Sequence, residues 1–194
     1  MDPPSPDAGL RSLVERARAG EPKARAALAE RFADPVFRFL LFLSRDADAA
    51  GDMAQETFLR VFARLADLRS PDAFAGWLFA IARSVRREGA RDARRGGISL
   101  EEVLDPSRGE EDPAATAELR EDLDRLARAL AALGERDREV IHLFHYAGLP
   151  ADEVARAFGV VPDSARRMLR EARGRLLGLF LEEKNQKIMR RDLP

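Results

Sequence analysis

Apolar residues recur every three or four positions along most of this 194-residue chain, and that spacing is typical of one face of an α-helix. No stretch alternates apolar and polar residues with the period of two that a strand requires. The pattern therefore predicts an all-α fold. Two or three short helices are expected between residues 10 and 44. Their predicted boundaries are Gly20-Glu21-Pro22 and Asp34-Pro35, because proline is favoured at the first position of a helix.

Two longer amphipathic helices are expected between residues 52 and 95. The apolar face of the first, at about residues 52–68, consists of Ala54, Phe58, Val61, Phe62 and Leu65. The second begins at Ser70-Pro71-Asp72, and its apolar face consists of Phe74, Trp77, Leu78, Ile81 and Val85. Six arginines and two acids lie among residues 83–97, which gives that stretch a net charge of +4.

An acidic stretch separates these helices from the rest of the chain. Residues 98–124 hold ten acids and two arginines, a balance of −8, and Pro106, Gly109 and Pro113 interrupt any helical pattern. This composition predicts a flexible linker at a domain boundary. We therefore expect one domain at residues 8–97, a linker at 98–117, a second domain at 118–181 and a charged, frayed tail at 182–194.

The second domain contains the pattern of a helix-turn-helix. After helices at about residues 119–133 and 136–147, an eight-residue helix, a turn at Gly159 and a longer helix occupy residues 149–180. The apolar residues expected to join these last two helices are Val154, Ala155, Phe158, Ala165, Leu169, Ala172 and Leu176. The outward positions of the last helix hold Arg166, Arg167, Arg170 and Arg173. Arginines there suit the base edges and phosphates of DNA, although an ordinary helical hairpin with a basic surface has the same pattern.

The composition narrows the classes of protein further. The chain contains no cysteine, which excludes disulfides and thiolate metal sites and fits a reducing cytoplasm. The segment from Met1 to Asp7 is acidic and rich in proline, so it does not have the pattern of a signal peptide. No run of 18 apolar residues occurs, and we expect no insertion into a membrane.

Nearly the whole chain resembles the extracytoplasmic-function (ECF) sigma factors of the sigma-70 superfamily, which give bacterial RNA polymerase its promoter recognition. The resemblance rests on ordered motifs at Asp52–Phe62, Phe74–Arg83, Arg136–Val140, Gly148-Leu149, Glu153–Ala155 and Phe158–Pro162. It implies two helical domains, sigma regions two and four, joined by a linker that threads through the polymerase. It also implies core RNA polymerase, promoter DNA and an anti-sigma factor as partners, with no catalytic chemistry and no cofactor.

The same resemblance implies three groups of site residues. The core-polymerase-binding group is Asp52, Gln55, Glu56 and Arg60. The minus-ten DNA group is Phe74, Trp77, Arg83, Ser84, Arg86 and Arg87. The minus-thirty-five DNA group is Ser164, Arg166, Arg167, Arg170 and Arg173. Helical geometry agrees for the first group, because positions i, i+3 and i+4 share an arc of about 100°.

Plainer structural roles stay open for several of these residues. The acids near the start of the first amphipathic helix could complement its dipole. Trp77 has the helical spacing of a core residue, and the arginines at positions 83, 86 and 87 could be solvated helix surface.

The sequence departs from the family pattern at positions that contact DNA in the family. Ser84 stands where the family usually has an asparagine, and serine has a shorter reach and fewer hydrogen-bonding groups. The recognition helix has Asp-Ser-Ala-Arg-Arg-Met at residues 163–168 in place of the usual Gly-Thr-Val-Lys-Ser-Arg, and Glu171 stands where a basic residue is common. The promoter sequence therefore cannot be predicted from the family.

Rival functions explain less of the chain. A stand-alone helix-turn-helix regulator leaves the Asp52–Phe62 face and the basic helix before residue 95 unexplained, and an adaptor that binds only proteins leaves both arginine faces unexplained. An enzyme is least expected, because the sequence has no glycine-rich phosphate loop and no recognisable pair of nucleophile and base. His142 and His145 lack an evident third ligand, so we expect no metal site.

Overall fold

The computed structural model describes residues 6–89 and 117–191, and every element in these two ranges is a helix, which confirms the predicted all-α fold. The predicted linker lies outside the described residues except for Ala117. The elements are α1 (Pro6–Arg18), α2 (Pro22–Ser44), α3 (Ala47–Arg64), the 3-10 helices η1 (Leu65–Asp67) and η2 (Pro71–Ala73), α4 (Phe74–Gly89), α6 (Ala117–Ala132), α7 (Glu135–His145), α8 (Ala151–Phe158) and α9 (Pro162–Arg191).

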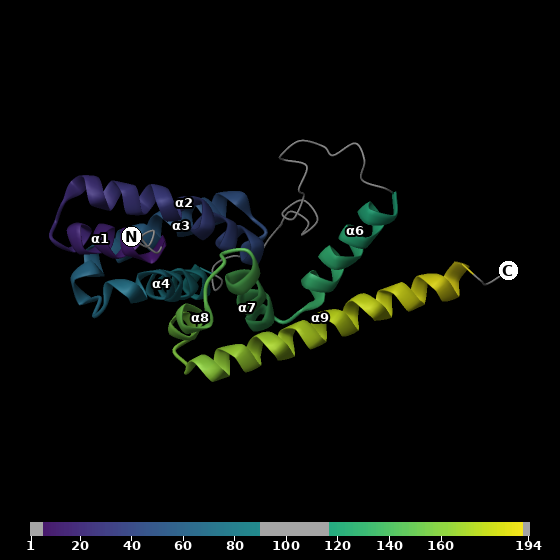
Figure 1. Cartoon of the computed structure of the whole chain (residues 1–194). Coiled ribbons are helices and arrows are strands. Elements are labelled where there is room, and N and C mark those ends of the chain that lie inside the picture. Colours follow the sequence, from purple (N-terminus) through teal and green to yellow (C-terminus); the bar gives the residue numbers. More distant parts are fainter. Residues whose placement is uncertain (1–5, 90–116, 192–194) are drawn as a thin grey trace.

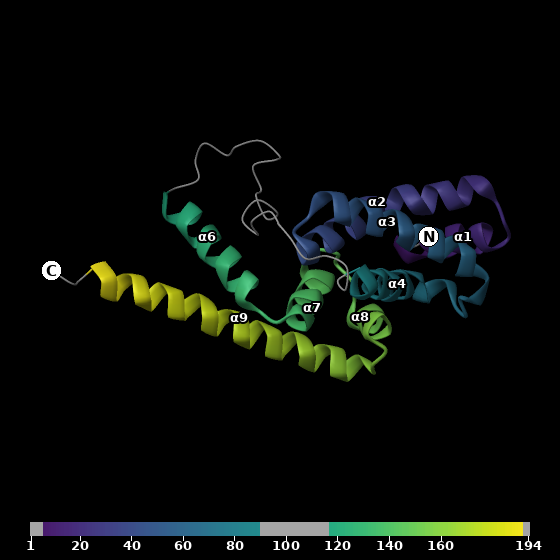
Figure 2. The same cartoon turned by 180° about the vertical axis from the view of Figure 1, so that it is seen from behind.

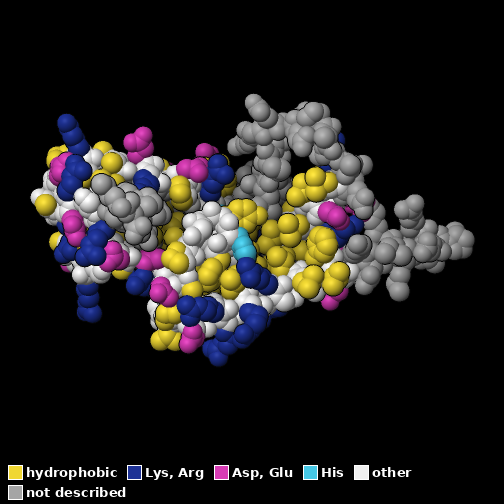
Figure 3. Space-filling model, in the orientation of Figure 1, with side chains coloured by type: hydrophobic (Ala, Val, Ile, Leu, Met, Phe, Trp, Pro, Cys, Tyr) yellow, Lys and Arg dark blue, Asp and Glu magenta, His cyan; other side chains and the backbone are white. Residues whose placement is uncertain are grey.

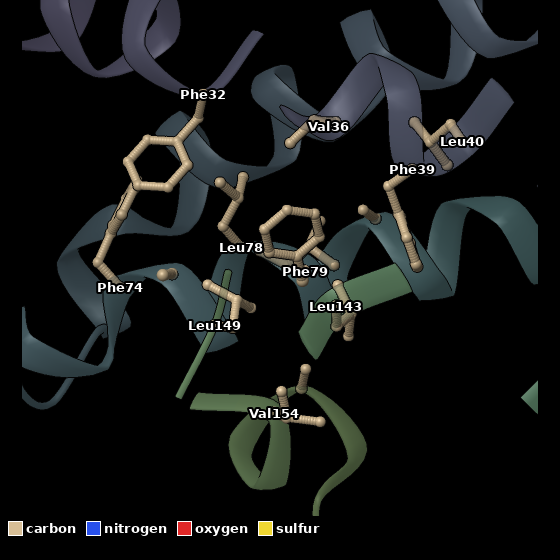
Figure 4. Packing of buried hydrophobic residues seen from close by; sticks show 14 of the residues in the cluster. Phe32, Val36, Phe39, Leu40, Phe74, Leu78, Phe79, Leu143, Leu149 and Val154 are labelled. Carbon is tan, nitrogen blue, oxygen red and sulfur yellow. The ribbon is translucent and has the colours of Figure 1, made fainter. Parts of the chain in front are cut away.

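Helices α1 to α4 form a first bundle in which α2 lies against α1 and α3, and α4 lies against α3 (Figure 1). Its core is rich in aromatic rings that meet edge to face. The ring centroids of Phe32 and Phe74 are 5.3 Å apart, and those of Phe39 and Phe79 are 5.4 Å apart (Figure 4). The side chain of Asp46 caps α3 by accepting a hydrogen bond of 3.0 Å from the backbone N–H of Ala49.

The predicted helix boundary at Asp34-Pro35 is wrong, because α2 is one continuous helix from Pro22 to Ser44. A proline inside a helix removes one backbone hydrogen bond and costs roughly 3 kcal/mol. Apolar packing offsets this cost. Phe32, Val36 and Phe39, on both sides of the proline, are all buried in the bundle core.

Helices α6 to α9 form a second bundle in which α9 is the common support for α6, α7 and α8 (Figure 1). Gly159 ends α8 in the left-handed region with φ +65°, a conformation that suits glycine, and this turn directs the chain into α9. The side chain of Arg138 donates hydrogen bonds to the carbonyl oxygens of Ala131 and Leu133, at 3.0 and 3.1 Å, and so satisfies the end of α6.

The predicted frayed tail differs from the structure, because α9 continues without a break through Glu182 to Arg191. Contacts with α6 support the extension. The Nε of Arg128 donates to Oε2 of Glu183 at 2.9 Å, and the guanidinium of Arg125 lies 5.4 Å from the ring centroid of Phe180. An apolar groove of about 360 Å³ lies between α6 and α9. Its lining includes Leu123, Leu126, Leu176, Leu177 and Phe180.

The two bundles pack directly against each other, with α4 across α8 and α2 beside α7 (Figures 1 and 2). One cluster of buried apolar side chains includes residues of both bundles. In that cluster Leu143, Leu149 and Val154 of the second bundle approach Leu78 and Phe79 of the first (Figure 4). The arrangement places the first helix of the helix-turn-helix over one face of α4.

Candidate nucleic-acid and protein interfaces

The first half of α9 presents arginines to solvent. Ala165, Leu169 and Ala172 bury the opposite face of the helix against its own bundle, so Arg166, Arg167, Arg170 and Arg173 are all exposed. Figure 3 shows Lys and Arg side chains gathered along this part of the molecule. The structure thus has the two helices and the turn that the helix-turn-helix pattern predicts, with a basic face on the second helix.

Acidic neighbours pair with two of these arginines. Nη1 of Arg166 donates to Oδ1 of Asp163 at 2.7 Å, and Nε of Arg167 lies 4.0 Å from Oε1 of Glu171. Both pairs are solvent-exposed and therefore weak, so each arginine can exchange its partner for a phosphate or a base edge. Glu171, which departs from the family pattern, is thus a neighbour of Arg167 on the same helix face.

Arg173 and Ser164 lie at the two ends of this face. The Nε of Arg173 is 3.1 Å from Nε2 of His145 on α7, and the pKa of His145 is lowered, first by partial burial and then by the charge of Arg173. Ser164 is partly buried in the first turn of α9, where its backbone N–H donates to the carbonyl of Val161 at 3.0 Å. Of Arg173 and Ser164, Arg173 has the more restrained side chain, because it is held by His145.

The outward face of α3 combines polar groups with one exposed leucine. Asp52 and Gln55 are exposed, and Glu56 accepts a hydrogen bond of 2.6 Å from Nε of Arg60. Leu59 is 60% exposed on the same face. Leu59 lies within the Asp52–Phe62 motif, but it is absent from the core-binding group expected from the sequence. Its position three residues after Glu56 and four after Gln55 is the signal that could have done so.

Arg60 connects this face to α4. Besides its bond to Glu56, its Nη1 donates to Oε2 of Glu88 at 2.7 Å. The hydrogen bonds that Arg60 donates to Glu56 and Glu88 raise the pKa of Arg60, and the bond to Glu56 is the larger cause. Arg60 thus orients Glu56 and joins two helices, while Asp52, Gln55 and Leu59 are exposed on the outward face of α3.

The six residues of the minus-ten group have very different surroundings. Phe74 is fully buried against Phe32, so its expected role as a DNA contact is corrected to a core role: its ring fills the space between α2 and α4. Trp77 is partly buried, and its ring centroid lies 6.4 Å from that of Phe74. Of the remaining four residues, Ser84 and Arg87 are exposed.

Partners within the first bundle restrain Ser84 and Arg86 on α4. The hydroxyl of Ser84 donates to Oε1 of Glu88 at 2.9 Å. Nη2 of Arg86, which is partly buried, donates to the carbonyl oxygen of Leu43 at 3.3 Å. Arg87 projects from the exposed side of the helix. The exposed residues of α4 are therefore Ser84, Arg87 and Glu88, with the partly buried Arg86 beside them.

Arg83, expected on the DNA-facing surface, is buried at the boundary between the bundles. Its Nε and Nη2 donate to Oε2 of Glu139 at 2.9 and 2.7 Å, and its Nη1 donates to the carbonyl oxygen of Ala157 at 2.7 Å. Its guanidinium also lies 3.7 Å from the ring centroid of Phe158. The expectation of a solvent-facing side chain is thus corrected, because α7 and α8 cover this position.

The two histidines lie in different surroundings. His142 is buried, its ring centroid is 5.0 Å from that of Phe42 and 5.2 Å from that of Tyr146, and burial followed by the charge of Arg38 lowers its pKa to about 3. Among the described residues, no group of three or more potential ligands surrounds either histidine. None of the helices in residues 6–89 and 117–191 is long and apolar enough to cross a membrane.

Comparison with known families covers both bundles. Residues 28–96 match the family described as sigma-70 region 2, and residues 123–176 match sigma-70, region 4. The solved structure of CnrH in complex with the cytosolic domain of CnrY has a TM-score of 0.65 at 24% identity, over 88% of this chain and 96% of that one. Sigma factor RpoE in complex with the anti-sigma factor NepR from Bartonella quintana has a TM-score of 0.51 at 23% identity, over 79% and 96%. These two likenesses show a shared fold.

Three curated relatives have similar sequences. ECF RNA polymerase sigma factor SigL of Mycobacterium tuberculosis is 32% identical over 88% of this chain and 96% of its own length. The probable RNA polymerase sigma factor RfaY of Xanthomonas campestris and the ECF sigma factor BldN of Streptomyces coelicolor are each 30% identical, over 91% and 80% of this chain. The chain spans only 45% of the length of RfaY and 60% of that of BldN. The match along almost the whole of SigL, with both sigma-70 regions in order, shows that this chain belongs to the ECF sigma factor family.

Proposed function

We propose that this chain binds core RNA polymerase and directs it to promoters, without catalysing a reaction itself. The proposal rests on one observation: this member of the family has two separate candidate binding surfaces. They are the polar face of α3 and the exposed arginines of α9. A DNA-binding regulator needs only the second face. A sigma factor needs both, because it must hold the polymerase and the promoter at the same time.

The proposed division of labour follows the two halves of the chain. Residues 8–97 act as sigma region two and residues 118–181 as region four, with 98–117 as the connection and 182–194 as a charged extension. The core-binding surface is Asp52, Gln55 and Glu56 with Leu59 beside them, and Arg60 orients Glu56. An exposed apolar side chain ringed by polar groups is a common arrangement at protein contacts.

The proposed DNA contacts lie on α4 and α9. Ser84, Arg86 and Arg87 face the minus-ten element, and Trp77 supports the segment that holds it. On α9, Arg166 and Arg167 are proposed to reach base edges in the major groove, since they lie in the first turns of the recognition helix. Arg170 and Arg173 are proposed to contact phosphates, with Ser164 beside the first turn.

An inhibitory partner is part of the proposal. The two similar solved structures are both complexes, CnrH with the cytosolic domain of CnrY and RpoE with the anti-sigma factor NepR. We infer that this chain, too, is controlled by an anti-sigma factor, and that it works in the cytoplasm where polymerase and promoter DNA are found. No cofactor is needed for any of these roles.

Formation of a ternary complex tests the proposal. The chain, labelled with a fluorophore, is mixed with core polymerase, with a pool of promoter-length DNA, or with both, and the complexes are separated by size. We expect stable binding to core polymerase alone and recruitment of a subset of the DNA only when all three are present. Tight, selective DNA binding by the chain without polymerase, and no binding to core, would instead favour a stand-alone regulator.

A further inference from the structure

Three arginines from both bundles lie together beside the ends of α2 and α6. Arg45 follows the last residue of α2, Arg86 lies near the end of α4, and Arg138 lies on α7. Nη2 of Arg45 and Nη1 of Arg138 donate to the same atom, the carbonyl oxygen of Ala131, at 3.4 and 3.0 Å. Two guanidiniums on one acceptor are necessarily close neighbours. We call Arg45, Arg86 and Arg138 the three-arginine cluster.

The positive charges of this cluster are not paired. All three side chains are partly buried, and the described residues supply no ion pair to any of them. The pKa of Arg138 is lowered, first by burial and then by the charge of Arg45, and the charge of Arg86 adds to the effect. Arg86 therefore lies close enough to the other two guanidiniums for their like charges to repel.

Two acids on α7 reduce this repulsion only in part. Glu135 and Glu139 both act to raise the pKa of Arg138. Glu139 is buried and accepts two hydrogen bonds from Arg83, so its charge is already balanced. Of the two acids, this leaves Glu135, which is exposed in the first turn of α7. The cluster therefore keeps an excess of positive charge.

The cluster also holds hydrogen-bond donors without partners. Nη1 of Arg138 makes both bonds to the end of α6, and Nε of the same side chain is buried with no partner among the described residues. Nε of Arg86 is buried and unpartnered in the same way. A buried donor without a partner destabilises a structure. Capping a helix end requires only the carbonyl bonds, so it does not account for three cations with unused donors in one place.

The backbone of Arg45 gives a second reason to assign a role to its side chain. Arg45 ends α2 in the left-handed region, with φ +58°. Glycine is favoured in this conformation at the end of a helix, and other residues seldom adopt it. An arginine at this position is therefore less favourable for the backbone than glycine, and its guanidinium is the group that differs.

We propose that Arg45, Arg86 and Arg138 bind a small phosphate-bearing anion, which joins the first bundle to the second. A phosphate group supplies the negative charge that the cluster lacks, and its oxygens can accept hydrogen bonds from more than one guanidinium. The edge formed by Nε and one Nη suits two parallel bonds to such an anion. A small anion fits better than a DNA backbone, because these arginines are partly buried between two bundles while those proposed to bind DNA on α9 are exposed.

Calorimetric titration of inorganic pyrophosphate into the full-length chain tests the site. Sodium chloride keeps the ionic strength constant, so general screening does not change. We expect a single site in the wild type and binding about tenfold weaker, or weaker still, in Arg45→Gln and in Arg138→Gln. Arg25→Gln is the matched control and should bind as wild type. Arg25 is also partly buried, and its Nε donates to the carbonyl oxygen of Ala17 at 3.2 Å.

Circular dichroism separates loss of the site from loss of the fold. Arg138→Gln also removes the bonds to the end of α6, so if its helicity falls, Arg45→Gln alone decides the result. Absence of pyrophosphate binding in the wild type overturns the site. So does an affinity of Arg45→Gln equal to that of wild type, or an equal loss of affinity in Arg25→Gln.

Fluorescence anisotropy of a labelled DNA duplex with a central unpaired bubble distinguishes a small anion from the nucleic-acid backbone. Arg45→Gln should bind this DNA as tightly as Arg25→Gln, which has the same net charge. Weaker DNA binding by Arg45→Gln than by Arg25→Gln, with no pyrophosphate binding by the wild type, would assign the cluster to the DNA backbone and overturn the proposal. Arg86 is not varied, because it also belongs to the proposed minus-ten contacts. Neither readout uses polymerase, so the site is tested separately from the proposed function.

Discussion

At the scale of single residues, partners far away in the sequence decide whether Arg83 of α4 is buried or exposed. Arg83 is bound by Glu139, 56 positions later, and by the carbonyl of Ala157, 74 positions later. Ser84 and Arg87, its neighbours along the helix, stay exposed. Helical spacing identifies which residues share a face, but it gives no information about a second domain that covers that face. The exposure of Arg83 was therefore predicted incorrectly.

His142 should make the packing of the bundles sensitive to acid. Its pKa is about 3, well below the 6.5 of an exposed histidine, because the imidazole is buried between Phe42 and Tyr146. The unfolded chain therefore binds more protons than the folded chain between these two pKa values. Stability is full above pH 6.5 and falls as the pH drops below it, by about 1–2 kcal/mol between pH 7 and pH 5.

Urea denaturation at several pH values measures this loss. A His142→Phe variant, which cannot titrate and can pack between the same rings, is the control, and its unfolding free energy should fall less over the same range. Other groups contribute to both chains alike, so the difference between the two slopes isolates His142. Parallel pH dependence in wild type and variant would show that the imidazole does not titrate as its burial implies.

At the scale of helices, apolar periodicity predicted the existence of each described element better than its ends. The amphipathic stretches at α3, α4, α6, α8 and α9 all appear as helices. The two errors of extent have physical causes. Proline favours a helix start, so the sequence predicts a boundary at Pro35, but buried residues on both sides hold one continuous helix together. The sequence predicts an end of the last helix near Phe180, but Arg128 on α6 supports the later turns of α9.

The polar face of α3 should control binding to core polymerase. Reversing both charges with Asp52→Arg and Glu56→Arg should weaken the affinity by about 2 kcal/mol or more, because one carboxylate is lost from the contact and another no longer pairs with Arg60. Circular dichroism should remain unchanged. Glu30→Arg, which reverses one exposed acid on α2, controls for charge reversal outside α3 and should bind as wild type. Unaltered co-purification of the double variant with core would remove α3 from the interface.

The exposed arginines of α9 should divide into two classes. Alanine at Arg166 or Arg167 should cost about 1–3 kcal/mol at one base position and relax the preference there, as expected of a base contact. Alanine at Arg170 or Arg173 should weaken all sequences alike and reduce the salt dependence of binding, as expected of a phosphate contact. Selection from a library of upstream elements distinguishes the two patterns.

A control on the same helix sharpens this experiment. Arg175 is bound to Asp137 of α7 at 2.6 and 2.7 Å, so Arg175→Ala changes the charge of α9 without removing a proposed DNA contact. It should leave the sequence preference unchanged. If the four other variants behave like Arg175→Ala, the first half of α9 does not read the promoter.

At the scale of the whole molecule, the sequence predicted two helical units but not the way they meet. The resemblance to ECF sigma factors rests on motifs inside each unit, and helical spacing gives no information about which residues of one unit contact the other. The periodic spacing of apolar residues identifies the buried face of a helix, but it does not show which helix of another unit packs against it. The packing of α4 against α8 and of α2 beside α7 is therefore visible only in the three-dimensional structure.

Promoter-specific transcription by core polymerase tests the central claim most directly. Purified core is supplied with this chain and a library of random upstream DNA, and the transcripts are sequenced to locate their starts. We predict starts downstream of one shared pair of sequence elements, with their number sharply reduced by Asp52→Arg plus Glu56→Arg and the upstream element altered by Arg166→Ala. Transcripts with the same starts and yield as core alone would contradict the assignment of this chain as a functional sigma factor.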